Sequence, residues 1–298
     1  MSATALTRAP AATSQGSYRL RAVSGATGRI VVLSIIAAYF VVPIVWLVVA
    51  STKTRGQLTT TPPFAIVDSH LWQNLTQLVS YDGGIFGQWA LNSALYAVTS
   101  AAVGTLIAVM AGYYLSLFPF RGSRFLFALV LGGVLVPTTA LSLPLFLLVA
   151  QVHLTDTFWA VFLPSIVNPL GFYLARVSTD AAVPREIVEA ARIDGAGEFR
   201  IFFSVGMRLL SPSIVTIFLL IFVGVWNNFL LPLLMLQTES KYPLTLGLYA
   251  WSGQEVQAPG LQTLVLIGSL VSVVPLMIAF LSLQRFWRNG IAAGGVKI

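Results

Sequence analysis

Six apolar runs of about 20 residues, the length that a helix needs to cross a bilayer, dominate this sequence. None of them contains Asp, Glu, Lys, Arg or His. Because backbone polar groups in lipid must be hydrogen-bonded within the protein, each run is expected to be an α-helix. The predicted spans are Ile30–Ala50, Ala90–Ser116, Phe125–Val149, Thr157–Ala175, Ser211–Leu236 and Gln262–Leu283. The sequence therefore predicts an all-α, polytopic membrane protein with six transmembrane helices.

The composition excludes a soluble enzyme. Hydrophobic residues make up 57% of the 298 residues and charged residues only 9%, whereas a soluble domain has about 45–50% and about 25%. The net charge of +7 is spread along the chain, so the clustered basic face of a nucleic-acid-binding protein is not expected. The chain has no cysteine, which excludes disulfides and thiol chemistry. We expect neither a catalytic residue nor a metal site.

The basic residues predict the orientation in the membrane. Fourteen lie before the first span, after the second, after the fourth and after the sixth, whereas only Lys53, Arg55 and Lys241 lie on the other side. Cytoplasmic segments carry the excess of Lys and Arg, so both termini are expected to be cytoplasmic.

Three regions follow from this topology. Residues 1–28 contain no acidic residue, and the apolar run begins too late for a cleaved signal peptide, so they are expected to be a disordered cytoplasmic tail. Residues 29–288 are expected to form the six-span domain, and residues 289–298 a cytoplasmic tail.

The predicted spans lack titratable residues, which argues against a proton-coupled carrier. They do contain prolines and uncharged polar residues: Pro43, Pro137, Pro144, Pro164, Asn168, Pro169, Pro232 and Pro275. Two interpretations are open. Broken helices can line a solute route, and proline is also commoner in membrane helices than in soluble ones. A route without charges suits a neutral, hydroxyl-rich solute.

The longest predicted cytoplasmic segment, residues 176–210, contains five basic and five acidic residues. Pro184 fits the first turn of a helix, and Gly195 fits the position just after its end. Ile187, Ala190, Ala191 and Asp194 recur at helical spacing between them, so one face is small and mildly apolar. A second amphipathic stretch, Glu198–Phe203, follows. A helix for anionic lipid should be net basic, so the balanced charge favours a protein partner.

Residues 189–203, EAARIDGAGEFRIFF, resemble the "EAA" loop of ABC-importer permeases, whose pattern is Glu-Ala-Ala, three residues and then Gly. Further similar stretches are Asn92-Ser93, Arg121–Arg124, Trp226-Asn227-Asn228-Phe229, Pro232-Leu233, Pro243–Leu248, Gln284-Arg285-Phe286 and Gly294–Lys297. Together they cover nearly the whole chain after residue 28. The protein resembles the six-span permeases of the carbohydrate branch, the maltose-importer type.

The resemblance implies a subunit of a larger importer in a prokaryotic inner or plasma membrane. The implied partners are a second permease subunit in a heterodimer, a dimer of ABC ATPases and an extracytoplasmic solute-binding protein. The chain has no GxxxxGK[ST] phosphate loop, so ATP and Mg²⁺ are expected on the partner ATPase and no cofactor on this chain. Thr52–Trp89 and Gln237–Leu261 are long enough to meet the binding protein.

The resemblance also implies roles for particular residues. ATPase coupling is expected at Glu186, Glu189, Ala190, Ala191, Asp194, Gly195, Phe199 and Arg200. Gly295 and Lys297 are expected to contact the ATPase, with a frayed chain end as the alternative. Arg208 stands where the family pattern has proline, so the helix is expected to continue unbroken into the fifth span. Asn228 stands where the pattern has Asp.

Trp226, Asn227, Asn228 and Asn168 are the expected residues of a solute pathway, because aromatic faces and amide groups suit a neutral sugar. Hydrogen bonding between helices by the Asn side chains is the alternative role. Three functions are therefore open. They are a sugar ABC-importer permease, an ABC permease for another solute such as a glycerol phosphate or a polyol, and a stand-alone carrier or channel.

Overall fold

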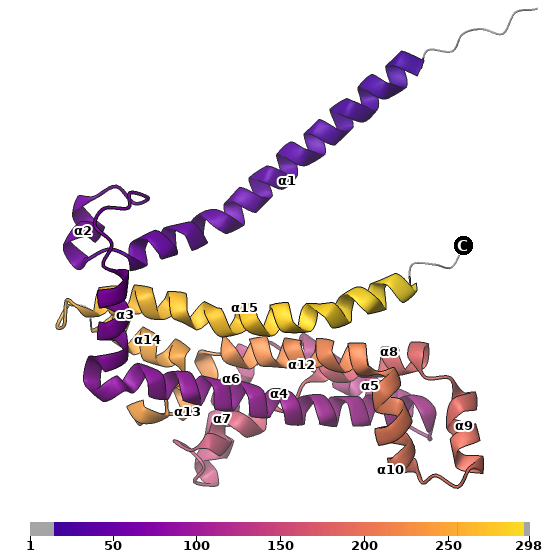
Figure 1. Ribbon diagram of the computed structural model, residues 1–298. Coiled ribbons are helices and arrows are strands. Elements are labelled where there is room, and N and C mark those ends of the chain that lie inside the picture. Colours follow the sequence, from indigo (N-terminus) through magenta and orange to yellow (C-terminus); the bar gives the residue numbers. More distant parts are fainter. Residues whose placement is uncertain (1–14, 255, 295–298) are drawn as a thin grey trace, which may run out of the picture.

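The computed structural model describes residues 15–254 and 256–294, and the regular structure in these ranges is helical. Three long helices form the body, with α12 (Ser211–Trp226) lying between α4 (Ile85–Leu117) and α15 (Leu261–Gly294) (Figure 1). A fourth long helix, α1 (Gln15–Ser51), diverges from this body at an angle. α8 (Pro169–Ala182) packs against both α4 and α12.

Shorter helices connect the long ones. They are α2 (Arg55–Thr60), α3 (Leu71–Ser80), α5 (Ser123–Gly132), α6 (Thr138–Gln151), α7 (Phe158–Ser165), α9 (Arg185–Ile193), α10 (Glu198–Ile201), α11 (Met207–Leu209), α13 (Leu230–Met235) and α14 (Leu244–Gly253). Single turns at Tyr81–Gly84, Gly133–Leu135, Phe202–Gly206 and Glu239–Lys241 complete the order.

Within the described ranges, four helical segments are long and apolar enough to cross a membrane. They are Gly28–Ser51, Leu71–Leu117, Phe158–Ala182 and Leu261–Gln284. Two bent pairs, Ser123–Leu135 with Thr138–Gln151 and Glu198–Leu209 with Ser211–Trp226, pass the same test only when each pair is taken together. The described chain therefore has four to six candidate spans, and the six predicted runs agree with the upper value.

Three of the predicted spans are each made of two helices. In the third, the chain bends by 103° between α5 and α6, at Pro137. Val136, the residue before this proline, has the extended backbone that such residues prefer. In the fourth, α7 ends at Ser165, and α8 begins at Pro169 after a break. In the fifth, α12 ends at Trp226 and α13 begins four residues later.

The prolines therefore have two different roles. Pro137 and Pro169 stand where new helices begin, which is where the missing N–H costs least. Pro43 and Pro275, by contrast, lie inside the continuous helices α1 and α15. Hydropathy alone does not distinguish these cases, and both interpretations of the prolines apply within this one chain.

Small residues bring α4 and α8 into close contact. A Cβ atom added at Gly112 of α4 would lie 2.6 Å from the backbone nitrogen of Arg176 and 2.7 Å from Cβ of Ala175, both on α8. A Cβ atom added at Gly104, two turns earlier on α4, would lie 3.0 Å from the carbonyl oxygen of Ile166, just before α8. Since helices in lipid associate mainly through such packing, this contact fixes α8 against the body.

Helix α1 has few contacts with the rest of the chain. Its apolar segment from Gly28 is exposed almost to its end, where Val49 and Ala50 are buried. The helix begins at Gln15, within the stretch expected to be a tail; residues 1–14 lie outside the described ranges. Each added residue gains a helical hydrogen bond, so the helix extends beyond the apolar run.

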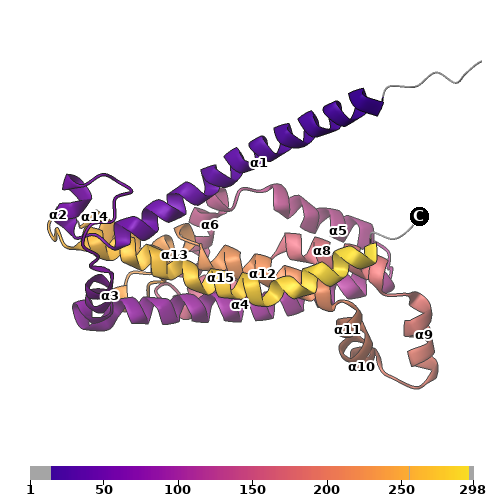
Figure 2. The ribbon, with the colours of Figure 1, turned by 45° about the horizontal axis from the view of Figure 1, so that its top comes forward.

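Two opposite ends of the molecule differ in structure (Figure 2). α2, α3 and α14 gather at one end, whereas α9 and α10 project from the other. The first described residues of α1 and the last of α15 point toward the end that carries α9 and α10. α15 is described as far as Gly294.

Substitution of Gly112 by alanine tests the α4–α8 contact. The added methyl group overlaps the α8 backbone, so we expect a loss of about 1–3 kcal/mol of stability. Gly132 in α5 is the matched control, because a Cβ there meets nothing within 4 Å. Thermal unfolding in detergent should show Gly112→Ala destabilised and Gly132→Ala unchanged or more stable. Equal midpoints for the two variants would contradict the proposed packing.

Candidate functional site

The projecting segment is built on α9, which lies between Pro184 and Gly195 as the sequence predicted. Gly195 has a φ of +81°, the left-handed conformation that glycine adopts without cost. Its N–H donates to the carbonyl of Arg192, and the N–H of Ala196 donates to the carbonyl of Ala191, each at 3.0 Å. These two bonds form a Schellman C-cap, which ends α9 sharply and turns the chain toward α10.

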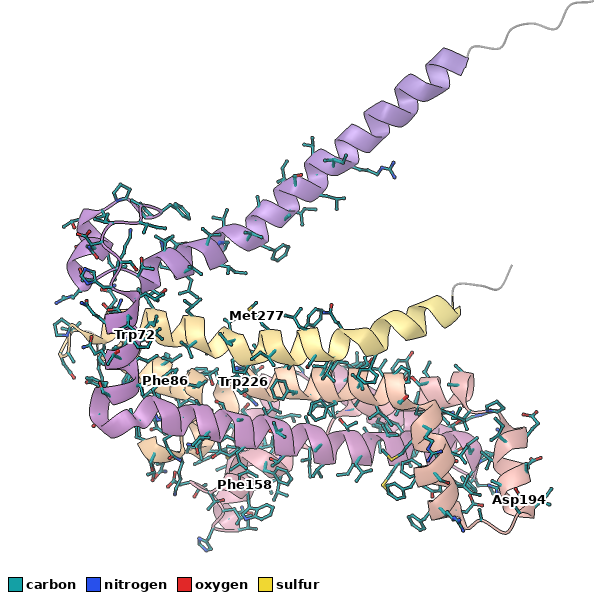
Figure 3. The ribbon with its side chains drawn as sticks, viewed as in Figure 1. Trp72, Phe86, Phe158, Asp194, Trp226 and Met277 are labelled. Carbon is teal, nitrogen blue, oxygen red and sulfur yellow. The ribbon has the colours of Figure 1, made fainter. Side chains whose placement is uncertain are left out.

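The outward face of this segment carries most of the predicted coupling residues. Glu186, Glu189, Ala190, Asp194, Gly195, Phe199 and Arg200 are exposed, and Asp194 lies at the tip in Figure 3. Ala191 is half-buried and turned toward the body with the buried Val188. Two apolar side chains stand out in solvent: Ile193 is 87% exposed and Phe199 is 66% exposed.

The inward face anchors the segment to α4. Phe202 is fully buried, with its ring edge-to-face against Tyr113 at 5.1 Å between centroids. Gly206 lies so close to the Tyr113 ring that an added Cβ would be 2.8 Å from it. Arg192 donates to Glu198 at 2.6 Å and lies 5.0 Å above the ring of Phe118. The segment is therefore packed directly on the end of α4.

The entry into α12 is bent, and the expectation of an unbroken helix at Arg208 is wrong. The axes of Glu198–Leu209 and Ser211–Trp226 differ by 83°. Pro212 lies in the first turn of α12; it has no N–H to give to the carbonyl of Arg208, and its ring crowds that carbonyl. A proline four residues further on thus ends the preceding helix without a proline at 208.

A cavity of about 500 Å³ lies where the three helix breaks converge. Three of the predicted pathway residues, Asn168, Asn227 and Asn228, line it together. The hydroxyl groups of Thr138, Thr139, Ser142 and Ser165 form a hydroxyl wall of the same cavity, and apolar side chains complete the lining. No lining residue is charged. Such a cavity offers donors and acceptors to an uncharged polar solute.

The three amides also support the local backbone. Asn168 Oδ1 accepts from the N–H of Gly171 at 2.6 Å and caps α8. Asn227 Nδ2 donates to the carbonyl of Val223, and Asn228 Oδ1 accepts from the N–H of Leu231. Each side-chain amide therefore uses either its oxygen or its NH2 group to hold the backbone at a helix break. The other group of each amide is left for a solute, so a structural role and a solute-facing role can both apply to the asparagines.

Trp226 does not line this cavity. Its side chain is 5% exposed, and its indole N–H donates to the carbonyl of Ser272 on α15 at 3.2 Å. The ring packs on Phe222, one turn earlier on α12. Trp226 is therefore a core residue that joins α12 to α15. It is the last residue of α12, and the asparagines that follow it belong to the helix break.

Sequence reasoning missed the hydroxyl wall of the cavity. Thr138 and Thr139 directly follow Pro137, and a helix break next to hydroxyl residues was the signal available for them. Gly295 and Lys297, predicted to contact an ATPase, lie outside the described residues. No group of three His, Asp or Glu residues within the described ranges is placed to hold a metal ion.

Comparison with known proteins identifies the family. Residues 104–290 match the family model of the binding-protein-dependent transport system inner membrane component. The arabinooligosaccharides transport system permease protein AraQ of Halalkalibacterium halodurans is 33% identical over 88% of this chain and 93% of AraQ. The melibiose/raffinose/stachyose import permease protein MelC of Bacillus subtilis is 28% identical over 93% of this chain and 100% of MelC.

A solved structure has the same fold. A bacterial ABC transporter involved in import of the acidic polysaccharide alginate contains a chain with a TM-score of 0.76 and 22% identity, covering 94% of this chain and 99% of that one. The chain described here belongs to the binding-protein-dependent inner-membrane permeases of ABC transporters. The family resemblance predicted from the sequence and the multi-pass inner-membrane location are thereby confirmed, as is the non-enzymatic class of the subunit.

The Schellman cap gives a test of the α9 geometry. A non-glycine residue in the left-handed region costs about 1–2 kcal/mol, so Gly195→Ala should loosen the last turn of α9. Gly197 is the matched control, since its φ is −70° and an added Cβ at either glycine meets nothing within 4 Å. Hydrogen exchange of the amides near residue 195 should accelerate roughly tenfold in Gly195→Ala only. Equal exchange in both variants would exclude a conformational role for Gly195.

Proposed function

We propose that this chain forms half of the translocation pathway of a sugar ABC importer, with both termini in the cytoplasm. Family membership carries the proposal, and the names of several relatives, AraQ and MelC among them, specify oligosaccharides or sugars. The orientation follows from the positive-inside rule. The end that carries α9 and α10 holds Arg121, Arg124 and the arginines of residues 176–210, and the opposite end holds Lys53, Arg55 and Lys241.

A separate ATPase supplies the energy through the projecting segment. The exposed acidic groups Glu186, Glu189 and Asp194 offer charge partners, and Ile193 and Phe199 offer apolar area to a docked surface. Such a mixture of exposed apolar side chains and a polar rim is typical of protein interfaces.

The buried side of the same segment supports transmission. Phe202 and Gly206 contact Tyr113 of α4, and Leu210 is buried at the bend into α12. Closure of the docked ATPases would therefore shift α4 and α12 together. We extend the docking surface to Gly295 and Lys297, because α15 ends at Gly294 at the same end of the molecule.

The solute route runs through the cavity of about 500 Å³. Its hydroxyl and amide lining matches the hydroxyl groups of a sugar, and its lack of charge favours a neutral sugar over a glycerol phosphate. In the complete importer the second permease subunit closes the open side of this cavity. A solute-binding protein delivers the sugar to the end that carries α2, α3 and the segment Gln237–Leu261.

Charge reversal at Glu189 tests the coupling proposal. A like-charge contact at an interface costs several kcal/mol, so Glu189→Lys should weaken ATPase pull-down by roughly tenfold or more and abolish ATP-driven uptake in proteoliposomes. Asp82→Lys makes the same charge change at the opposite end of the molecule and should leave pull-down intact. Uptake that proceeds without any ATPase subunit would contradict the ABC assignment and favour a stand-alone carrier.

Removal of a cavity hydroxyl tests the sugar route. Thr139→Val keeps the side-chain shape but loses one hydrogen bond worth about 1 kcal/mol, so the solute concentration for half-maximal uptake should rise about fivefold. Thr99→Val on α4 is the control, because Thr99 lies outside the cavity and donates to its own helix. Both variants should bind the ATPase normally. If the half-maximal concentration is unchanged in Thr139→Val, the Thr139 hydroxyl does not bind the solute and the proposed route along this wall is wrong.

A further inference from the structure

An ion pair joins two loops at the end of the molecule opposite α9. Lys241 Nζ lies 2.6 Å from Asp156 Oδ2 and also donates to the backbone carbonyl of Asp156 at 2.6 Å. The other carboxylate oxygen accepts from the N–H groups of Gln237 and Thr238 at 2.9 and 3.0 Å, and the Thr238 hydroxyl donates to Oδ2. Asp156 thus accepts bonds from three residues of one turn.

The Asp156 carboxylate is suited to hold this turn at neutral pH. Partial burial raises its pKa, but the hydrogen bonds from Lys241, Thr238 and Gln237 outweigh that effect and hold the pKa well below its usual range. The carboxylate therefore stays ionised at neutral pH. Its side chain is 23% exposed and that of Lys241 is 43% exposed, so solvent weakens the pair without breaking it.

Helix α4 holds the turn from the other side. The indole N–H of Trp89 donates to the carbonyl of Glu239, the Asn92 amide donates to the carbonyls of Ser240 and Tyr242, and the Tyr96 hydroxyl donates to the carbonyl of Lys241. The Lys241 backbone is consequently fixed to α4, and its ammonium group binds the loop before α7 from a fixed position.

The pair lies at the far ends of the two short helices that touch the cavity. α7 begins just after Asp156 and reaches the cavity at its other end with Pro164 and Ser165. α13 runs the opposite way: it lines the cavity near its start with Leu231 and ends beside Asp156. There the N–H of Asp156 donates to the carbonyl of Met235 at 2.7 Å. Between these ends the two helices share an apolar cluster.

We propose that α7 and α13 form one outer wall of the cavity, held shut toward the outside by a latch between Asp156 and Lys241. Because the Lys241 backbone is fixed to α4, the latch ties this wall to α4 and keeps the cavity closed to external solvent until the importer changes state. This proposal rests on the proposed orientation, in which the latch end is extracytoplasmic, and on no assumption about the solute.

The absence of cysteine from the chain permits a direct test. In cells that express the complete importer, Ser165→Cys places a single thiol of this chain on the cavity wall, and a membrane-impermeant maleimide reports its access from outside. Asp156→Asn or Lys241→Met, added to the Ser165→Cys chain, should increase the labelling rate about fivefold. The increase is modest because a partly exposed ion pair contributes only about 1 kcal/mol. Lys241→Arg keeps the charge and should label near the parent rate.

Asp82→Asn is the matched control. Asp82 also has a positive φ, 46° against 56° for Asp156, and lies in the turn Tyr81–Gly84 between α3 and α4. It does not line the cavity, so Asp82→Asn should not change the labelling. The latch is overturned if Asp156→Asn and Lys241→Met assemble normally and label at the parent rate, or if Asp82→Asn accelerates labelling equally. Ser240→Cys as the single thiol of an otherwise unchanged chain checks the orientation independently. If this thiol does not react from outside, the proposed topology is overturned, and the outer latch with it.

Discussion

Helices in the apolar core of a membrane gain little from hydrophobic burial, so the backbone contact at Gly112 is what holds α8 against α4. α4 continues from this contact to Tyr113, which receives the buried face of the projecting segment. α8 begins at Asn168, on the cavity wall. One close helix pair therefore joins the surface proposed for the ATPase to the cavity proposed for the solute, without a flexible connection between them.

Hydropathy predicted where the chain crosses the membrane, because apolar length is a property of each segment alone. It did not predict where the helices break, since the outcome at a proline depends on the surrounding packing. Pro137 and Pro169 begin new helices, whereas Pro43 lies inside one. The bend at Leu210 was not expected, because the family's proline is absent at residue 208; Pro212 lies in the first turn after the bend instead.

Local motifs predicted the projecting segment well, because the ends of α9 are set by Pro184 and Gly195 within a few residues of chain. Of the four residues expected on a solute pathway, the three asparagines line one cavity, whereas Trp226 packs against α15. Amide chemistry is visible in a sequence, but the direction in which a residue at a helix end points depends on the neighbouring helix. The Asp156–Lys241 pair joins residues 85 positions apart, a separation that no periodic pattern reveals.

The three helix breaks around the cavity have a consequence for how such a subunit changes its cargo. Non-helical backbone at membrane depth is tolerated where it is buried in protein or lines a cavity, and here it borders the cavity together with Thr139 and Asn227. Exchange of those side chains leaves the peptide dipoles in place. On the proposed solute route, substitutions at such positions can therefore change which solute is recognised, while the polar groups of the main chain stay available to each new one.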